Sequence, residues 1–231
     1  MRVLGIVTAR GGSKGVPRKN VRPIAGKPLI AWTAAAAAAS TRLARTVVST
    51  DDDEIARIAR ESGLEVPFMR PAELAKDDTP TLPVLQHVVR MLEAAGDRYD
   101  AVCLLQPTNP CRTGSMIDDC IALLESSQAD SVISVLPIPA EHHPCWAFFG
   151  NADGDLRLAM GGTVPIPRRQ DLPPAFHRDG SIYVTRRDVL LGGSLYGTRV
   201  VGHAVEASRS VNIDSFDDWA RAEALLSAMG A

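Results

Sequence analysis

Short apolar runs alternate with segments of helical periodicity along almost the whole chain, and no other feature constrains the fold as strongly. Runs rich in valine, isoleucine and leucine predict strands at 2–8, 46–50, 64–69, 100–105, 131–136 and 181–185. Between them, an alanine-rich segment and three amphipathic stretches predict helices at 28–39, 51–61, 82–92 and 116–124. This alternation is typical of βαβ units, so the sequence predicts an α/β fold around a mainly parallel sheet.

Residues at the predicted helix ends sharpen this assignment. Asp51 is placed to cap the helix that runs to residue 61. Ser215, with Asp218 three residues later, forms a capping-box pattern and predicts the start of the last helix. His87 falls within a predicted helix, where we interpret it as an ordinary surface imidazole.

A chain of 231 residues commonly folds around one core, which predicts a single domain at 1–231. The segment 137–177 departs from the alternation, because seven of the 16 prolines lie between Pro137 and Pro174. A long surface loop or a cover over a substrate would explain this composition. The aromatic residues of the segment need a partner surface, so we expect an insertion or dimerisation arm, and hence a homodimer.

The sequence gives no indication of a membrane protein or of export. The longest apolar run, 29–39, is shorter than the ~20 residues of a membrane helix. Basic residues follow the first apolar stretch instead of preceding it, unlike a signal peptide. The four cysteines have no metal-site or disulfide spacing, so we expect reduced thiols and a cytoplasmic protein.

The charge is distributed unevenly. The net charge is only −2, yet the first 50 residues hold nine of the 25 basic residues and no acidic residue. This asymmetry predicts an anionic ligand near the N-terminus. Nucleic acid is an unsuitable candidate, because aromatic residues make up only 5% of the chain and no stacking pattern follows the basic residues.

A glycine-rich, basic loop at 9–20 follows the first predicted strand. Glycines let the backbone approach a ligand and the cations can face it, which is typical of phosphate binding. The loop lacks the Gly-Lys-Ser/Thr end of a Walker A motif, and Arg10 stands where a dinucleotide fingerprint needs glycine. A tight, solvated turn is the alternative interpretation.

The loop, Ala-Arg-Gly-Gly-Ser-Lys-Gly-Val-Pro-Arg-Lys-Asn, resembles the signature of the acylneuraminate cytidylyltransferases (CMP-sialic acid synthetases). Further blocks resemble this family in the expected order, at 26–29, 49–51, 70–75, 105–110, 170–174 and 179–183. The resemblance implies a three-layer, Rossmann-like nucleotidyltransferase fold with a mixed, mostly parallel sheet. It also implies transfer of CMP from CTP to a nonulosonic acid, a nine-carbon keto sugar acid, with Mg²⁺ as cofactor. A Kdo-type enzyme for an eight-carbon acid and a catalytically silent CTP- or CMP-sugar-binding protein are the alternatives.

The same resemblance implies the site residues. The nucleotide would be bound by Arg10, Gly11, Gly12, Ser13, Lys14, Asn20 and Arg70. For Arg70, a salt bridge at a strand end is the alternative. The sugar acid would contact Gln106, Arg169 and Tyr183, and the residues with catalytic roles would be Arg10, Lys19 and Asp214.

The metal site departs from the family pattern. Relatives usually carry Asp-x-Asp before the last helix, whereas this chain has Asn212 and Asp214, which leaves one carboxylate. An asparagine can ligate Mg²⁺ through its carbonyl oxygen, so we predict that these two residues hold the metal. Other acidic clusters, at 51–53 and 153–155, are interpreted as a helix cap and a loop turn, and the pair His142 and His143 lacks a third zinc ligand.

Overall fold

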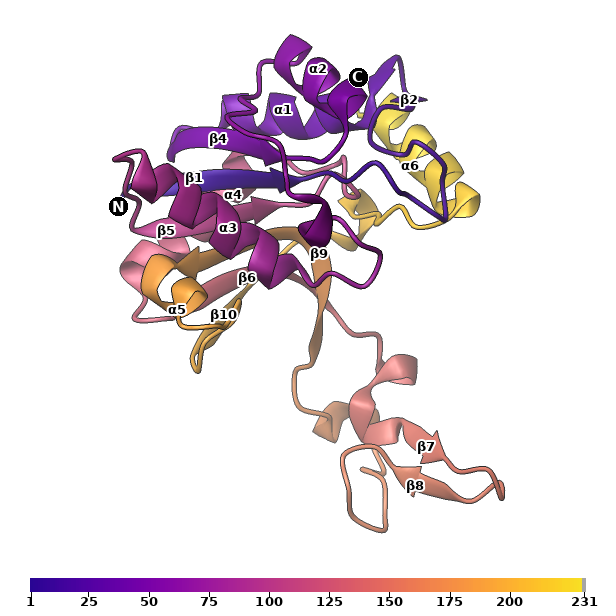
Figure 1. Cartoon of the computed structure of the whole chain (residues 1–231). Coiled ribbons are helices and arrows are strands. Elements are labelled where there is room, and N and C mark those ends of the chain that lie inside the picture. The colour runs from indigo at the N-terminus through magenta and orange to yellow at the C-terminus, as the bar shows by residue number, and fades with distance from the viewer. Residues whose placement is uncertain (230–231) are drawn as a thin grey trace.

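A six-stranded sheet forms the centre of the computed structural model, which describes residues 1–229 (Figure 1). The strand order is β10-β6-β9-β5-β1-β4. The strands are β1 (Val3–Thr8), β4 (Leu43–Ser49), β5 (Ala101–Leu105), β6 (Ser131–Pro137), β9 (Phe176–Arg186) and β10 (Val200–Ala204). Only β9 runs antiparallel to its neighbours in this sheet, so the predicted mixed, mostly parallel sheet is confirmed.

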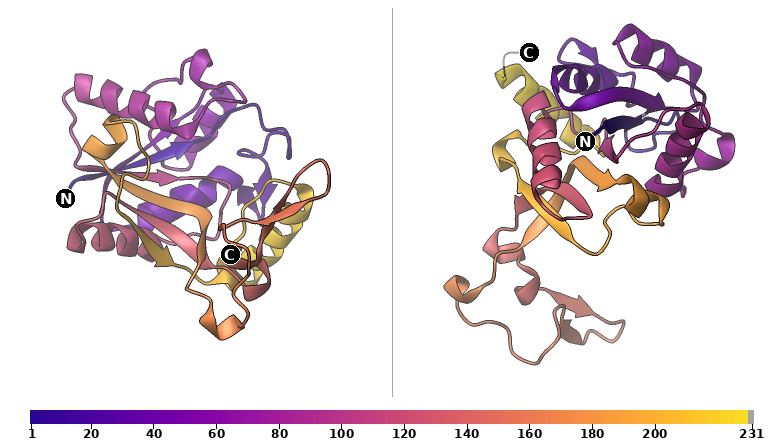
Figure 2. Two further views of the ribbon diagram at one scale, coloured as in Figure 1. Left: turned by 90° about the horizontal axis from the view of Figure 1, so that it is seen from below. Right: turned by 90° about the vertical axis from the view of Figure 1, so that its left-hand side faces the viewer.

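Helices cover both faces of the sheet (Figure 2). One face is covered by α1 (Leu29–Ala39), α2 (Asp53–Glu61) and α4 (Gly114–Ser126), and the other by α3 (Thr81–Ala94) and α5 (Arg187–Leu191). Alternate residues of β1 point to the two faces, so Val3 and Val7 pack in one core cluster and Leu4 and Ile6 in the other. The predicted three-layer arrangement follows from this alternation.

A third, smaller core lies beneath α6 (Phe216–Ala228). Trp219 and Leu226 of this helix pack against Val16, in the basic loop, and against Ile24. Ile24 belongs to a short hairpin formed by β2 (Pro23–Ile24) and β3 (Lys27–Pro28). The C-terminal helix therefore supports the basic loop near the N-terminus.

The predicted capping box of α6 is confirmed. The Ser215 hydroxyl accepts a hydrogen bond from the Asp218 amide at 3.2 Å, and the Asp218 carboxylate accepts one from the Ser215 amide at 2.9 Å. Two orphan amides are thus satisfied at the point where the helix begins. This fixes the segment 211–214, which immediately precedes the cap.

Three details of the sequence-based assignment were wrong. The segment 64–69 is not a strand, because Pro67 lacks an amide hydrogen and only Glu65 bridges to β4. Asp52, not Asp51, caps α2 by accepting a hydrogen bond from the Ile55 amide at 2.9 Å. His87 is not a surface imidazole, since its Nδ1 atom is buried and its ring packs edge-on against Phe68.

The segment 137–177 connects β6 to β9; its first residue and its last two are still paired in the sheet, and the part between them protrudes from the body as an arm (Figure 1). The arm holds a small hairpin, β7 (Phe148–Gly150) with β8 (Leu156–Leu158). Short 3₁₀ turns lie in it at Ala140–His142, Pro144–Trp146 and Arg169–Asp171; two others, Ala72–Leu74 and Ala207–Arg209, belong to the body. His143 accepts the Cys145 amide and contacts the Pro173 carbonyl, so it holds the arm together.

Two smaller expectations can be compared with the structure directly. All four cysteines are free thiols, and three of them are buried. No helix within residues 1–229 is long and apolar enough to span a bilayer.

Candidate active site

The basic loop at 9–20 follows β1 and is fixed by close packing. A Cβ atom on Gly15 would lie 2.0 Å from the Asp214 carbonyl oxygen, so only glycine allows the loop to approach the segment before α6. Val16 is fully buried beneath it. Asn20 is also buried, and its side-chain amide donates to the Arg10 carbonyl at 3.1 Å. These contacts give the loop one defined shape.

The acidic cluster at 51–53 holds the other side of the loop. Arg18, which has a positive φ of 57°, forms ion pairs with Asp52 at 2.5 Å and with Glu54. The hydrogen bond from Arg18 lowers the pKa of the Asp52 carboxyl. Asp51 accepts a hydrogen bond from the Gly11 amide at 3.2 Å. The cluster is therefore occupied by loop contacts as well as by the helix cap.

A cavity of about 390 Å³ lies beside this loop. The predicted site residues that line it are Arg10, Ser13, Lys14, Lys19, Asn20, Arg70, Gln106 and Asp214. Gly11 and Gly12 lie in the loop that carries these side chains but outside the cavity lining. Residues far apart in the sequence are thus gathered around one space, in which the cations predominate.

Two of these cations converge on an acid that the sequence did not reveal. The Asp77 carboxylate lies 2.8 Å from Arg10 Nη1 and 2.5 Å from Lys14 Nζ. The hydrogen bond from Lys14 is the main cause that lowers the pKa of Asp77. Asp77 therefore neutralises the positions at which a triphosphate would be bound.

Arg70 is held at the end of β4 and is almost fully buried. Its Nε donates to the Ser49 hydroxyl at 3.0 Å and its Nη2 to the Ser49 carbonyl at 2.5 Å. Among residues 1–229 it forms no ion pair, so the alternative of a strand-end salt bridge was wrong. Burial lowers the pKa of Arg70. A buried cation of this kind at a cavity wall suits an anionic ligand.

A second cavity, of about 490 Å³, adjoins the first and shares Gln106, Thr108 and Asp214 with it. Tyr183, which was expected to contact the sugar acid, lines the second cavity. At the border, Lys19 Nζ donates to the Ile213 carbonyl at 2.5 Å and lies 3.4 Å from Asp214 Oδ1. The two cavities provide neighbouring spaces for two substrates.

Asn212 and Asp214 lie side by side at this border. The Asn212 side-chain amide donates to Asp214 Oδ2 at 2.6 Å. The Asn212 carbonyl oxygen faces Gly180, where a Cβ atom would come within 3.8 Å of it. No group of three or more His, Cys, Asp or Glu side chains within residues 1–229 is placed to hold a metal. One carboxylate and one amide are therefore the protein ligands available here.

A buried network that sequence reasoning missed supports the border. Arg112 donates to the Gln106 carbonyl at 3.1 Å, to the Ser181 carbonyl at 2.7 Å and to the Thr33 hydroxyl at 2.7 Å. Burial lowers the pKa of Arg112 to about 10. Asp179 accepts hydrogen bonds from the Ser181 amide and hydroxyl, at 3.0 and 2.7 Å. The network fixes Gln106 and the turn at 179–181 against each other.

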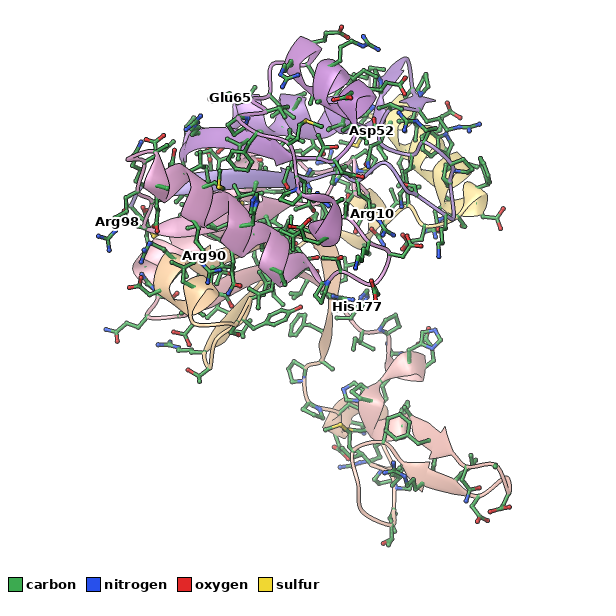
Figure 3. All side chains as sticks on the ribbon, in the orientation of Figure 1. Arg10, Asp52, Glu65, Arg90, Arg98 and His177 are labelled. Atoms are coloured by element: carbon green, nitrogen blue, oxygen red, sulfur yellow. The ribbon has the colours of Figure 1, made fainter. Side chains whose placement is uncertain are left out.

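Apart from the two glycines of the loop, Arg169 is the one predicted site residue that does not line either cavity. It lies in the arm, where it lines a separate hollow with His143, Leu172 and Pro173. Figure 3 shows Arg10 and His177 at one end of the sheet, with Arg98 at the opposite end. His177 lines the second cavity and lies near the start of β9, where the arm ends.

The two adjoining cavities are both lined by basic side chains, and the second also holds Tyr183. A model of the cytidylyltransferase family matches residues 4–145. CMP-N,N'-diacetyllegionaminic acid synthase of Legionella pneumophila is 34% identical over 229 residues, which cover 98% of this chain and 97% of that protein. The chain therefore belongs to the cytidylyltransferase family, which confirms the expected family and nucleotidyltransferase class.

Two further comparisons agree with this assignment. N-acylneuraminate cytidylyltransferase A of Danio rerio is 31% identical over 223 residues, which cover 96% of this chain but only 50% of the fish protein. The solved structure of CMP:2-keto-3-deoxy-manno-octonic acid synthetase complexed with CTP covers 99% of this chain, with a TM-score of 0.74. At 19% identity, that similarity shows the fold alone.

Proposed function

We propose that this enzyme transfers CMP from CTP to the anomeric hydroxyl of a nonulosonic acid and releases pyrophosphate. The observation that carries the proposal is the pair of adjoining cavities, one lined by loop cations and both sharing Gln106, Thr108 and Asp214. Relatives that are 31–34% identical are named for legionaminic and acylneuraminic acids. The relative named for the octonic acid is only 19% identical, which favours a nonulosonic acid over Kdo.

The chemistry requires positive charge more than a protein nucleophile. The oxygen of the sugar hydroxyl forms a bond to the α-phosphorus of CTP and releases its proton to solvent, while the bond from the α-phosphorus to the oxygen that bridges to the β-phosphate breaks and pyrophosphate leaves with its electrons. Arg10, Ser13 and Lys14 would hold the triphosphate and offset the charge that develops on the leaving group. Lys19, fixed on the Ile213 carbonyl at 2.5 Å, would add a cation at the border between the two substrates.

The remaining first-cavity residues would orient the nucleotide. Arg70 is buried and free of carboxylate partners within residues 1–229, so its charge is available to CTP. Asn20 closes the loop through the Arg10 carbonyl and would keep Arg10 directed into the cavity. Gln106 would contact both substrates, since its side-chain amide can donate and accept hydrogen bonds in one place.

The residues at the border include ligand types that Mg²⁺ uses. Asp214 supplies one carboxylate, and the Asn212 side-chain amide, which now donates to Asp214, would have to turn over to present its oxygen to the same metal; both residues line the second cavity. Mg²⁺ sites commonly combine one or two carboxylates with substrate phosphates, so this pair together with CTP forms a suitable ligand set. When bound, the metal would neutralise phosphate charge. Asn212→Asp should lower the Mg²⁺ concentration that gives half-maximal activity.

The arm supports a homodimer. It exposes Phe148, Phe149 and Phe176, which would be covered if the arm packed on a second copy of the chain. Arg169, far from the cavities of its own chain, would then reach the sugar acid bound by the neighbouring copy. The free cysteines favour a reducing compartment, which supports our proposal that the enzyme works in the cytoplasm.

Pyrophosphate release tests the proposed function directly. The protein is mixed with CTP, ATP or GTP and with N-acetylneuraminic acid, a legionaminic acid or Kdo, at several Mg²⁺ concentrations. We expect turnover with CTP and at least one nonulosonic acid. Turnover with Kdo alone would identify the eight-carbon alternative. Binding of CTP without pyrophosphate release, even in Asn212→Asp, would show a silent binding protein.

A further inference from the structure

An irregularity in the pairing of β6 with β9 shapes the wall of the second cavity. Tyr183 lies opposite Ile133, and Arg178 lies opposite Val135, so four residues of β9 oppose the single residue Ser134. Partners in a ladder point to the same face, and residues two apart in a strand share a face. The irregularity therefore places Arg178 and Tyr183 on one face, although five positions separate them and a regular strand would place them on opposite faces.

The acids in this cavity are already occupied. Asp179 accepts hydrogen bonds from Ser134 and Ser181. Asp218 serves in the capping box of α6. Asp214 accepts from Asn212 and lies 3.4 Å from Lys19 Nζ. Their oxygen atoms therefore have donors within the protein.

The basic side chains of the cavity differ in this respect. The pKa of Asp218 is lowered mainly by the hydrogen bond from Ser215, with a smaller contribution from Arg221, so the charge of Arg221 has a carboxylate in its vicinity. The Nδ1 atom of His177 lies 3.1 Å from the backbone carbonyl oxygen of the next residue, Arg178. Arg178 forms no ion pair within residues 1–229, and its close polar neighbours are the phenols of Tyr183 and Tyr196, which raise its pKa. A phenol is uncharged at neutral pH, so the charge of Arg178 is not neutralised.

We propose that Arg178 binds the carboxylate of the sugar acid in the cavity of its own chain and thereby sets the preference for a keto acid. This inference rests on the proposed function and names the group that recognises the acid. A guanidinium presents paired N–H donors that match a carboxylate.

The position of the carboxylate in the substrate explains why this contact matters for the reaction. In a nonulosonic acid the carboxyl group and the attacking hydroxyl are bonded to the same carbon. Gln106 lies close to Gly180, two residues after Arg178, with 3.6 Å between its side-chain oxygen and the position of a Cβ on that glycine. An acid bound by Arg178 thus has its hydroxyl near the border with the nucleotide cavity. Arg169 would need a second copy for such a contact, whereas Arg178 does not.

The test compares Arg178→Gln with Arg221→Gln, a matched loss of one cation from the same cavity, using the sugar acid and its methyl ester. For Arg178→Gln we expect the KM for the acid to rise about 10- to 100-fold, with the KM for CTP unchanged. For the wild type, the KM for the methyl ester should exceed the KM for the acid by a similar factor. For Arg178→Gln, the KM values for the ester and the acid should be nearly equal. Arg178→Lys should recover part of the loss, and Arg221→Gln should keep the wild-type preference for the acid.

Calorimetric binding of the acid and the ester to the CMP-loaded protein separates this inference from the proposed function. Preferential binding of the acid that depends on Arg178, without pyrophosphate release, would overturn the proposed function and leave the role of Arg178 intact. An equal penalty for the ester in the wild type and in Arg178→Gln would overturn the role of Arg178. Arg178 is exposed, so melting temperatures should confirm that each variant is folded.

Discussion

The basic loop at 9–20 and the arm at 137–177 are both long segments with little regular structure. Only the loop is packed firmly against the rest of its own chain. The loop buries Val16, fits Gly15 against the Asp214 carbonyl and is tied to α2 by Arg18. The arm has internal hydrogen bonds, such as the one from the Trp146 indole to the Ile166 carbonyl at 2.6 Å. Leu158 is buried within the arm, but several of its larger apolar side chains nevertheless remain in solvent.

Exposure makes the contrast quantitative. In the arm, Phe148 is 49% exposed, Leu156 68% and Val164 77%, whereas Val16 in the loop is 0% exposed. Large apolar side chains gathered on a protruding segment indicate a surface that another molecule covers. The difference teaches that an irregular segment can be fixed by its own chain, as the loop is, or be left with exposed apolar side chains, as the arm is, which agrees with the proposed roles of the two segments.

The largest expected effect concerns the loop. Arg10→Ala should lower kcat/KM for CTP about 100- to 1000-fold, because one of the cations that stabilises the leaving pyrophosphate is lost. Steady-state pyrophosphate release measures this effect. Arg57→Ala, which removes an exposed arginine paired with Glu61 in α2, is the control and should change little. Unfolding of the Arg10 variant, seen by circular dichroism, would instead make Arg10 structural.

The next effect concerns the arm. Phe148→Lys should convert the proposed dimer to monomers at micromolar concentration and lower activity about 100-fold, because each site then lacks the arm of the second copy, with recovery at higher protein concentration. Light scattering and pyrophosphate release follow the two changes together. Met91→Lys alters a residue of α3 that is 44% exposed and should affect neither. A wild-type protein that is already monomeric at this concentration would contradict the proposal that the arm forms a dimer.

A smaller effect is expected at Asp77, the counterion of the loop cations. Asp77→Asn removes a carboxylate that competes with the triphosphate for Arg10 and Lys14, so the KM for CTP should fall about twofold to fivefold. Inhibition by pyrophosphate should become stronger for the same reason. Asp78→Asn, one residue further on, is the matched control. A rise in the KM for CTP would show that Asp77 assists nucleotide binding.

The smallest effect concerns the anchor of the loop. Asn caps helices about as well as Asp, so Asp52→Asn isolates the ion pair with Arg18 and should cost about 0.5 kcal/mol at pH 7, since both groups are partly exposed. Arg18 lowers the pKa of Asp52 in the folded state. The stabilisation is therefore complete above the unfolded pKa of about 3.9 and is lost as the pH falls through the lower folded value. Urea titrations should show that the free energies of unfolding of the wild type and Asp52→Asn become equal as the pH falls below the folded pKa of Asp52.

The sequence predicted those features that depend on local patterns. The capping box of Ser215 and Asp218, the loop at 9–20 and five of the six strands of the sheet follow from patterns of neighbouring residues, whereas β10 was missed. Asp77 was missed because Arg10 and Lys14 lie more than 60 positions before it, and Arg112 because two of its partners, Thr33 and Ser181, are also more than 60 positions away. The segment 64–69 was assigned wrongly because its apolar residues suggested a strand that Pro67 cannot continue.

We propose that each active site uses the loop of its own chain and the arm of the second copy, and one mixture of two variants tests this. Arg10→Ala supplies an intact arm and Arg169→Gln an intact loop, and each variant alone should be nearly inactive. Random pairing makes half of the dimers mixed, each with one intact site, so remixed subunits should recover about a quarter of the wild-type rate of pyrophosphate release from CTP and the sugar acid. A rate that stays at the average of the two variants, although mixed dimers have formed, would contradict the account.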